Sequence, residues 1–163
     1  MSNRPYGPGL FSASEVGKWE WRGNVLVDAL GHQIAAVRSD VLVVGEERIL
    51  IEYSHSALKF RIRATTGNGE ISTVRQRGIS LKDLDADCAG RKYTLTRTSL
   101  WSKERVINSD SGLVAIVRPL PCGNVEILDK PGETAITPLV DAVFLSWACV
   151  LADAAVRHPR LAK

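Results

Sequence analysis

From residue 18 to about 129, hydrophobic and polar side chains alternate with a period of two, the pattern of half-buried β-strands. Turn residues such as Gly23-Asn24 and Gly67-Asn68-Gly69 separate the alternating segments. We count eleven strands, at residues 18–22, 25–28, 34–38, 41–44, 49–53, 58–64, 71–77, 93–98, 103–108, 113–117 and 125–128. Connections this short leave no room for βαβ crossovers, so the pattern predicts an antiparallel sheet in which each strand pairs with the next.

The stretch from Ser80 to Gly90 interrupts this pattern. We interpret it as an acidic, solvent-exposed loop, with a single helical turn beginning at Ser80 as an alternative. Three aspartates stand there at every second position, as they do at the start of an EF-hand calcium loop: Asp83, Asp85 and Asp87. Cys88 and Thr94, however, occupy the positions where that loop needs a glycine and a bidentate glutamate. The sequence therefore predicts no metal site here.

The end of the chain predicts a helix over residues 138–156, preceded by a threonine that can cap it. Between Asp141 and Asp153 the one polar residue is Ser146, so this helix is hydrophobic around its whole circumference. Such a helix must be enclosed on every side, by lipid or by protein. We expect nearly complete burial of the large side chains on its different sides: Phe144, Leu145, Trp147 and Leu151.

The length of the helix separates these two environments. The eleven residues between its two aspartates span roughly 16 Å, whereas the hydrocarbon core of a bilayer is about 30 Å thick. A longer span would include Asp141 and Asp153, which are costly in lipid, although a C-terminal membrane anchor stays the alternative. A barrel of eleven or twelve strands has a bore wide enough for a helix of about 10–12 Å. We therefore predict a mainly β fold, a closed antiparallel β-barrel of about 11–12 strands around a buried C-terminal helix.

Two segments of the chain share a local arrangement. Residues 25–38 read as a strand, a D-x-x-G turn and a strand, similar to the unit typical of LURP-one-like chains. Residues 106–118 look like a second copy, with Ser109 in place of the aspartate. Together with a helix-filled barrel over residues 18–156, these segments resemble the tubby C-terminal domain, the plant LURP-one-related proteins and the phospholipid scramblases. The resemblance implies a module that binds membrane lipid or phosphoinositide, and it assigns no lipid-contacting residue.

Composition narrows the class of protein. The 163 residues are 45% hydrophobic and 24% charged, which fits one globular domain; we assign residues 16–158 to it and residues 1–15 to a flexible arm. The cysteines are too far apart for a disulfide framework or a metal-binding pair: Cys88, Cys122 and Cys149. Since the first residues also lack a secretory signal, we expect a cytoplasmic protein, peripherally attached to membranes if it binds lipid.

Catalytic motifs are not recognisable in the sequence. It contains no G-x-S-x-G elbow, H-E-x-x-H helix or glycine-rich phosphate loop, so we predict no catalytic residue, cofactor or metal. His55 lies between two serines, the arrangement closest to a nucleophile and its base, but a polar loop explains it equally well. Aromatic stacking on nucleic acid would need exposed tryptophans. Trp19, Trp21 and Trp147 lie in apolar patterns that predict core packing, whereas Trp101 has polar neighbours.

A basic hairpin is the feature that points to a ligand. Between residues 59 and 77 the chain has one acid, Glu70, and five cations: Lys59, Arg61, Arg63, Arg75 and Arg77. Alternate positions of a strand share a face, so these side chains form one patch if the hairpin pairs in register. Guanidinium groups bind phosphate oxygens in pairs, although the solvated outer face of a barrel would explain the charges too.

These observations leave three classes of function. We expect a non-enzymatic binding module for an anionic lipid headgroup or another phosphate-bearing ligand. A nucleic-acid-binding protein that uses the same patch is one alternative, although a net charge of +3 is small for that class. A small enzyme or metabolite binder with a dispersed site is the other. A barrel filled by its own helix leaves little interior room for such a site.

Overall fold

The structure is a computed structural model, and it describes residues 18–54, 59–130 and 137–153. These residues form twelve strands and one helix: β1 (Lys18–Arg22), β2 (Val25–Val27), β3 (Gln33–Arg38), β4 (Val41–Val44), β5 (Glu47–Ser54), β6 (Arg61–Thr65), β7 (Ile71–Gln76), β8 (Asp83–Cys88), β9 (Arg91–Arg97), β10 (Arg105–Ser109), β11 (Gly112–Pro119), β12 (Val125–Asp129) and α1 (Leu139–Asp153).

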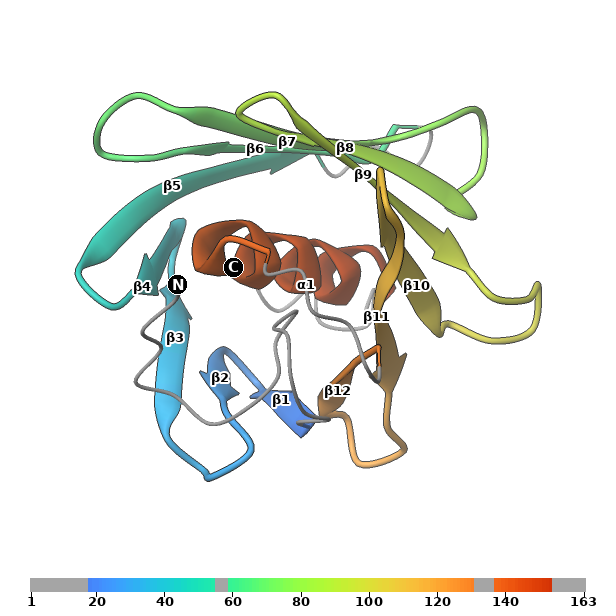
Figure 1. Ribbon diagram of the computed structural model, residues 1–163, viewed down its shortest axis with the longest axis horizontal. Coiled ribbons are helices and arrows are strands. Elements are labelled where there is room, and N and C mark those ends of the chain that lie inside the picture. The colour runs from blue at the N-terminus through green and yellow to red at the C-terminus, as the bar shows by residue number, and fades with distance from the viewer. Residues whose placement is uncertain (1–17, 55–58, 131–136, 154–163) are drawn as a thin grey trace.

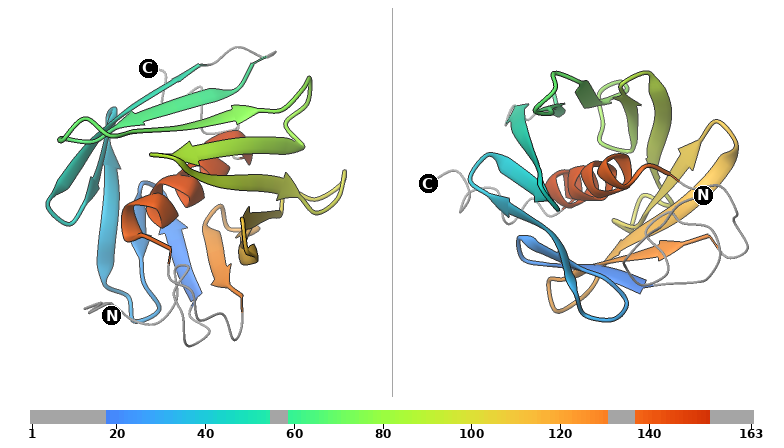
Figure 2. Two further views of the ribbon diagram at one scale, coloured as in Figure 1. Left: turned by 45° about the horizontal axis from the view of Figure 1, so that its top comes forward. Right: turned by 60° about the vertical axis from the view of Figure 1, so that its left-hand side comes forward.

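The strands form a closed antiparallel barrel. Each strand pairs with the next along the chain, and β12 closes the barrel by pairing with β1, with Trp19 opposite Ile127. Helix α1 lies inside the ring of strands, as two further views show (Figures 1 and 2). The predicted fold, a mainly β barrel of about 11–12 strands around the C-terminal helix, is confirmed.

Helix α1 is the centre of the hydrophobic core. All thirteen residues from Asp141 to Asp153 are buried, and so are the large side chains on its different sides, as predicted: Phe144, Leu145, Trp147 and Leu151. The described part of the chain contains no helix that is both long enough and apolar enough to cross a membrane. Protein thus surrounds this apolar helix on every side, which is what its even hydrophobicity requires.

Ion pairs hold both ends of α1 to the barrel wall. Near the start, the carboxylate of Asp141 accepts hydrogen bonds from Arg91 at 2.6 and 2.9 Å and from the hydroxyl of Tyr93 at 2.9 Å. At the end, the carboxylate of Asp153 accepts hydrogen bonds from Arg97 and Arg105. The two aspartates that make a membrane span costly therefore fix the helix inside the barrel.

The acidic segment before residue 90 is a strand, which corrects the prediction of a loop or helical turn from Ser80 to Gly90. In β8 the inward side chains Leu84, Ala86 and Cys88 are buried, while the aspartates between them point outward. Hydrophobic contacts on the inner face outweigh the low strand propensity of aspartate, because the outer face is open to water. This strand is the twelfth of the barrel.

Other predictions have mixed outcomes. Trp19, Trp21 and Trp147 are buried in the core as expected, whereas Trp101 is exposed. The helix is observed from Leu139 to Asp153, inside its predicted bounds of 138–156. The N-terminal arm at residues 1–15, the histidines at positions 55 and 158, and the domain's last residues lie outside the described residues.

Candidate anion-binding site

The basic hairpin is formed by β6 and β7, and its register brings the predicted cations onto one face. Arg61 lies directly opposite Arg75, and Arg63 lies opposite Thr73. The pairing continues beyond the strands, since the amide of Gln76 donates to the carbonyl of Phe60 at 3.1 Å. The alternate residues Ile62, Ala64 and Val74 are buried, so the arginines between them point away from the core. All five predicted cations are exposed on the outer wall: Lys59, Arg61, Arg63, Arg75 and Arg77.

Arg77 differs from the other four because a carboxylate of the neighbouring strand binds it. Its Nε and Nη2 atoms donate to both oxygens of Asp85, at distances of 2.6 to 3.2 Å. These hydrogen bonds hold the pKa of Asp85 below its ordinary value. Asp87, further along β8, is likewise bound by the ammonium group of Lys92 and by the amide of Gly90.

The remaining four cations, Lys59, Arg61, Arg63 and Arg75, form no ion pair with any residue that the structure describes. Arg75 acts on Asp85 through space, but the hydrogen bonds to that carboxylate come from Arg77. Arg61 lies between Ser54 of β5 and Arg75 of β7 in the sheet, so neither cross-strand neighbour is acidic. Two arginines therefore face each other without an ion-pair partner among the described residues, and Arg75 has the acidic neighbour Asp85 on its other side.

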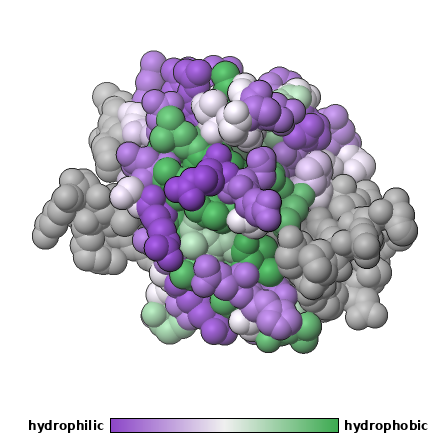
Figure 3. Space-filling view, turned by 90° about the vertical axis from the view of Figure 1, so that its left-hand side faces the viewer, coloured by the Kyte–Doolittle hydropathy of each residue, from purple (hydrophilic) through white to green (hydrophobic). Residues whose placement is uncertain are grey.

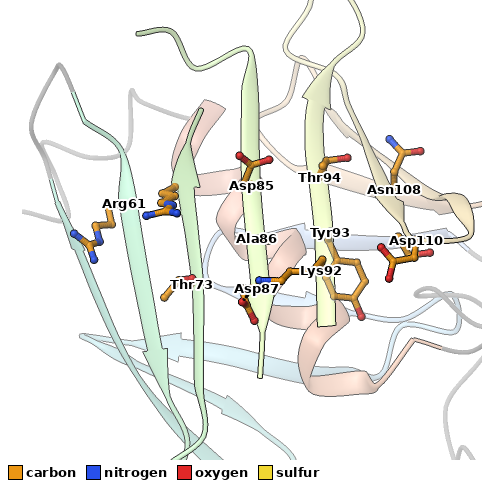
Figure 4. Close-up of a pocket in the computed structure, with 12 residues that line it drawn as sticks. Arg61, Thr73, Asp85, Ala86, Asp87, Lys92, Tyr93, Thr94, Asn108 and Asp110 are labelled. Atoms are coloured by element: carbon orange, nitrogen blue, oxygen red, sulfur yellow. Dashed lines mark hydrogen bonds and ion pairs between the residues drawn. The ribbon is translucent and has the colours of Figure 1, made fainter. Parts of the chain in front are cut away.

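A groove of about 510 Å³ runs across the outer wall from these arginines. The strand registers place one row of side chains along it, from β6 to β10: Arg61, Arg75, Asp85, Thr94 and Asn108. A second row beside it contains Thr73, Asp87 and Lys92 (Figure 4). The groove therefore has two arginines at one end, and hydroxyl, amide and carboxylate groups together with the ammonium group of Lys92 along the rest.

A second hollow, of about 410 Å³, lies on the other side of Arg61 and is lined by β5 and β6. Its residues are Glu52, Tyr53, Ser54, Arg61 and Arg63. Glu52 lies opposite Arg63, so one of the two arginines in this hollow has an acidic cross-strand neighbour. Arg61 lines both hollows, which makes it the centre of the cationic surface.

A third cavity, of about 240 Å³, opens where α1 begins and is lined by the β6–β7 turn, Arg91 and Asp141. On the face that bears the β4–β5 and β6–β7 turns, hydrophobic side chains occupy the centre and hydrophilic ones surround them (Figure 3). Two of the charged groups that line this cavity bind each other, because Arg91 donates to Asp141, which also accepts a hydrogen bond from Tyr93. This arrangement anchors the helix.

His55 and Cys88 carry side chains that could serve in catalysis. His55 lies outside the described residues. Cys88 is buried beside this anchor, and burial, followed by the charge of Asp141, raises the pKa of its thiol to about 12. At neutral pH that thiol is protonated, so it is a poor nucleophile. Among the residues described, no group of three or more histidines, cysteines and acids is placed to hold a metal ion.

Sequence reasoning missed half of this surface, namely the contributions of β8, β9 and β10. The alternation of Asp83, Asp85 and Asp87 with apolar residues was a signal for a strand, and a strand there would have placed carboxylates beside the arginines. Thr94 and Asn108 carry no motif and enter the site only through strand register. No family model, curated protein or solved structure matches the chain.

Proposed function

We propose that this protein is a non-enzymatic binding module that holds a compact phosphate-bearing ligand on its outer wall, at the β6–β7 hairpin. Arg61 and Arg75 supply paired guanidinium donors, with Lys59 and Arg63 on either side. One observation supports this most strongly: Arg61 and Arg75 lie directly opposite each other, and neither forms an ion pair with a carboxylate among the described residues, although Asp85 is the neighbour of Arg75 on β8. Arginine suits such a ligand because its planar fork donates to two phosphate oxygens at once.

The energetics of the sheet favour a ligand between the two arginines. Like charges directly opposite each other on neighbouring strands destabilise a sheet. Asp85, which lies opposite Arg75 on β8, is hydrogen-bonded by Arg77 and therefore offsets only part of the repulsion. A phosphate between the guanidinium groups would replace this repulsion with two sets of charge-assisted hydrogen bonds.

The neighbouring groups favour a small, hydroxyl-bearing anion over an extended one. Thr73, Thr94 and Asn108 offer hydrogen bonds to hydroxyl groups of a bound ligand, and they line the same groove. The outward aspartates of β8, by contrast, interrupt the positive surface after two strands. A nucleic-acid backbone would place further phosphates against those carboxylates, whereas a phosphorylated polyol, free or as a lipid headgroup, fits between them.

Binding assays on matched variants test the proposal. The ligands are a soluble inositol phosphate, phosphatidylcholine vesicles with and without a phosphoinositide, and a short oligonucleotide. Replacing both Arg61 and Arg75 by threonine should weaken binding of the anionic ligand by about tenfold or more, since each lost charge-assisted hydrogen bond contributes about 1.5–3 kcal/mol. Equal binding by the native and doubly substituted proteins would contradict the proposal.

Arg48→Thr is the control. Arg48 is also an exposed arginine on an outer strand position, opposite Val43, and it lies outside the groove. This substitution removes one positive charge outside the groove, as Arg61→Thr or Arg75→Thr alone removes one inside it, and it should leave binding nearly unchanged if the site is specific. The soluble and vesicle arms separate a free phosphate ligand from a lipid headgroup. Steeply salt-dependent oligonucleotide binding that requires Arg61 and Arg75 would instead favour the nucleic-acid alternative.

A further inference from the structure

Three large apolar side chains are exposed on two loops at one end of the barrel. Ile79 is 97% exposed in the β7–β8 loop, and Leu100 and Trp101 are 77% and 94% exposed in the β9–β10 loop. Both loops project from the right-hand side of Figure 1, and also of the left view of Figure 2. The amide of Arg97 donates to the carbonyl of Lys82 at 3.0 Å, which joins the bases of the two loops. We name these three residues the apolar tips.

Local hydrogen bonds shape the loop that carries two of the apolar tips. The hydroxyl of Ser99 accepts hydrogen bonds from the amides of Trp101, at 3.2 Å, and Ser102, at 3.1 Å. The base of this loop is closed by Thr98, whose amide donates to the carbonyl of Glu104 at 2.9 Å. The backbone is thus held in a turn that directs the indole of Trp101 into solvent.

The β7–β8 loop is also held at its base. The side-chain amide of Gln76 donates to the carbonyl of Gly78 at 3.0 Å, and the amide of Lys82 donates to the hydroxyl of Ser80 at 3.3 Å. Gly78 has a φ of +112°, a backbone conformation that favours glycine. Ile79 therefore follows Gly78 in a turn whose hydrogen bonds hold the backbone while the isoleucine side chain stays in solvent.

Three lysines lie at the same end of the barrel as the apolar tips. Lys82 and Lys103 belong to the two loops, and Lys59 lies at the same end of the hairpin; none of the three forms an ion pair with a residue that the structure describes. The acid in the β9–β10 loop, Glu104, is occupied by Arg118 at 2.8 Å. Among the described residues of these loops, the three lysines outnumber the one acid without an ion pair, Asp83 at the start of β8, and Lys59 connects them with the Arg61–Arg75 site.

We propose that the apolar tips dock this end of the barrel onto a bilayer containing anionic lipid. Tryptophan prefers the interfacial zone of a membrane, where its ring is apolar and its N–H group is hydrated. Lysines around the tips are attracted to the anionic surface. Separate tips on projecting loops enter a fluid bilayer without a shaped partner, whereas a protein interface needs a continuous complementary patch. The inference rests on the proposed function, because the phosphate bound near Arg61 would then be a lipid headgroup.

Vesicle binding by loop variants of the full chain tests this docking. Replacing all three apolar tips by serine should weaken binding to phosphatidylcholine–phosphoinositide vesicles by about tenfold or more, because the variant loses the favourable transfer of three large apolar side chains out of water. Binding of soluble inositol phosphate should stay within about twofold of the native value, since the Arg61–Arg75 site is intact. In the native protein, brominated lipids should quench the fluorescence of Trp101.

Leu30→Ser is the matched control. Leu30 is also an exposed leucine in a turn, but it lies between β2 and β3, and successive connections alternate between the two ends of the barrel. Native vesicle affinity in the triple variant would overturn the docking proposal, as would an equal loss in Leu30→Ser. Self-association of the native protein that disappears in the triple variant would also overturn it, since the tips would then bind a second copy. Failure of the proposed function looks different: soluble inositol phosphate would then bind equally with and without Arg61 and Arg75.

Discussion

The indole nitrogen of Trp21 in β1 donates a 2.8 Å hydrogen bond to the hydroxyl of Ser146 in α1, joining residues 125 positions apart. The hydroxyl of Ser146 donates in turn to the carbonyl of Val143 at 2.9 Å. The ring of Trp21 also packs on that of Trp147, with centroids 4.7 Å apart. The polar residue in the middle of the apolar helix is thus the partner that a buried tryptophan N–H group needs.

Removal of this contact should destabilise the fold. Ser146→Ala leaves the Trp21 N–H group buried without a partner, which typically costs about 1–3 kcal/mol. Trp147→Ala removes a core side chain and should cost about 3–5 kcal/mol of the free energy of unfolding. Urea denaturation measures both changes. Trp101→Ala is the control, because an exposed substitution should change stability by no more than about 0.5 kcal/mol; equal losses from Trp101→Ala and Trp147→Ala would contradict this account of the core.

Arg105 and Asp153 form a buried ion pair that fixes the end of α1. All five N–H groups of Arg105 are used, by both oxygens of Asp153 and by the carbonyls of Leu81, Lys82 and Leu95. Replacement of Asp153 by asparagine should cost about 3–5 kcal/mol, because it leaves the buried guanidinium without its counter-charge. Urea denaturation should show a smaller loss for the double variant Arg105→Met, Asp153→Leu; a larger loss in the double variant would refute this prediction.

The arginines of the hairpin should differ in their effect on stability. Arg61 faces Ser54 and Arg75, so Arg61→Thr removes a repulsion and should leave the free energy of unfolding unchanged or raise it by about 0.2–1 kcal/mol. Arg63 faces Glu52, so Arg63→Thr removes an attraction and should lower it by a similar amount. Thermal denaturation of the two variants gives the comparison. A greater loss of stability in Arg61→Thr than in Arg63→Thr would contradict this prediction, because Arg61 would then stabilise the folded protein.

Alkaline pH should destabilise the protein through its buried thiols. Burial raises the pKa of Cys88 to about 12 and also raises that of Cys149. Above about pH 9 the unfolded chain therefore loses protons that the folded chain keeps, and stability falls as pH rises toward the folded pKa values. The slope is at most about 1.4 kcal/mol per pH unit for each thiol.

Urea denaturation at about pH 8 and about pH 10 measures this loss. A variant with alanine at both buried cysteines should lose less stability between the two pH values than the native protein. Cys122→Ala is the control, since Cys122 is exposed and should leave the slope unchanged. An unchanged slope in the double variant would show that other groups govern the alkaline response.

The barrel could be predicted from the sequence because the pattern of the strands and the hydrophobicity of the C-terminal helix both require it. The alternation of hydrophobic and polar residues predicted most strands of the barrel wall. The helix is hydrophobic on all sides, which required protein around Phe144, Trp147 and their neighbours. Strand β8 was missed because Asp83, Asp85 and Asp87 have low strand propensity. On the outer face of the barrel two of these aspartates are bound by cations, as Asp85 is by Arg77. Such contacts stabilise the strand only after β7 and β8 have paired, so the local sequence does not reveal them.

The site could be predicted only in part. Alternation within one hairpin was enough to group Arg61, Arg63 and Arg75, because neighbouring strands share a turn. Which cations are neutralised depends on β8, whose carboxylates bind Arg77 and Lys92. The apolar tips were predicted only in part: Trp101 was set apart from the core tryptophans, but the exposure of Leu100 and Trp101 depends on the turn around Ser99, which has no motif in the sequence.

The most direct test of the anion site is the NMR response of individual arginine side chains in the full chain. The Nε–H resonances, assigned with Arg61→Lys and Arg75→Lys variants, are followed as an inositol phosphate is added. We predict that Arg61 and Arg75 shift together in a saturable manner, while Arg91 and Arg97, which are bound to Asp141 and Asp153, stay in place. The proposal that these opposed arginines hold the ligand would be contradicted if binding of the inositol phosphate saturates without a shift of the Arg61 and Arg75 resonances, or if only the resonances of other arginines shift.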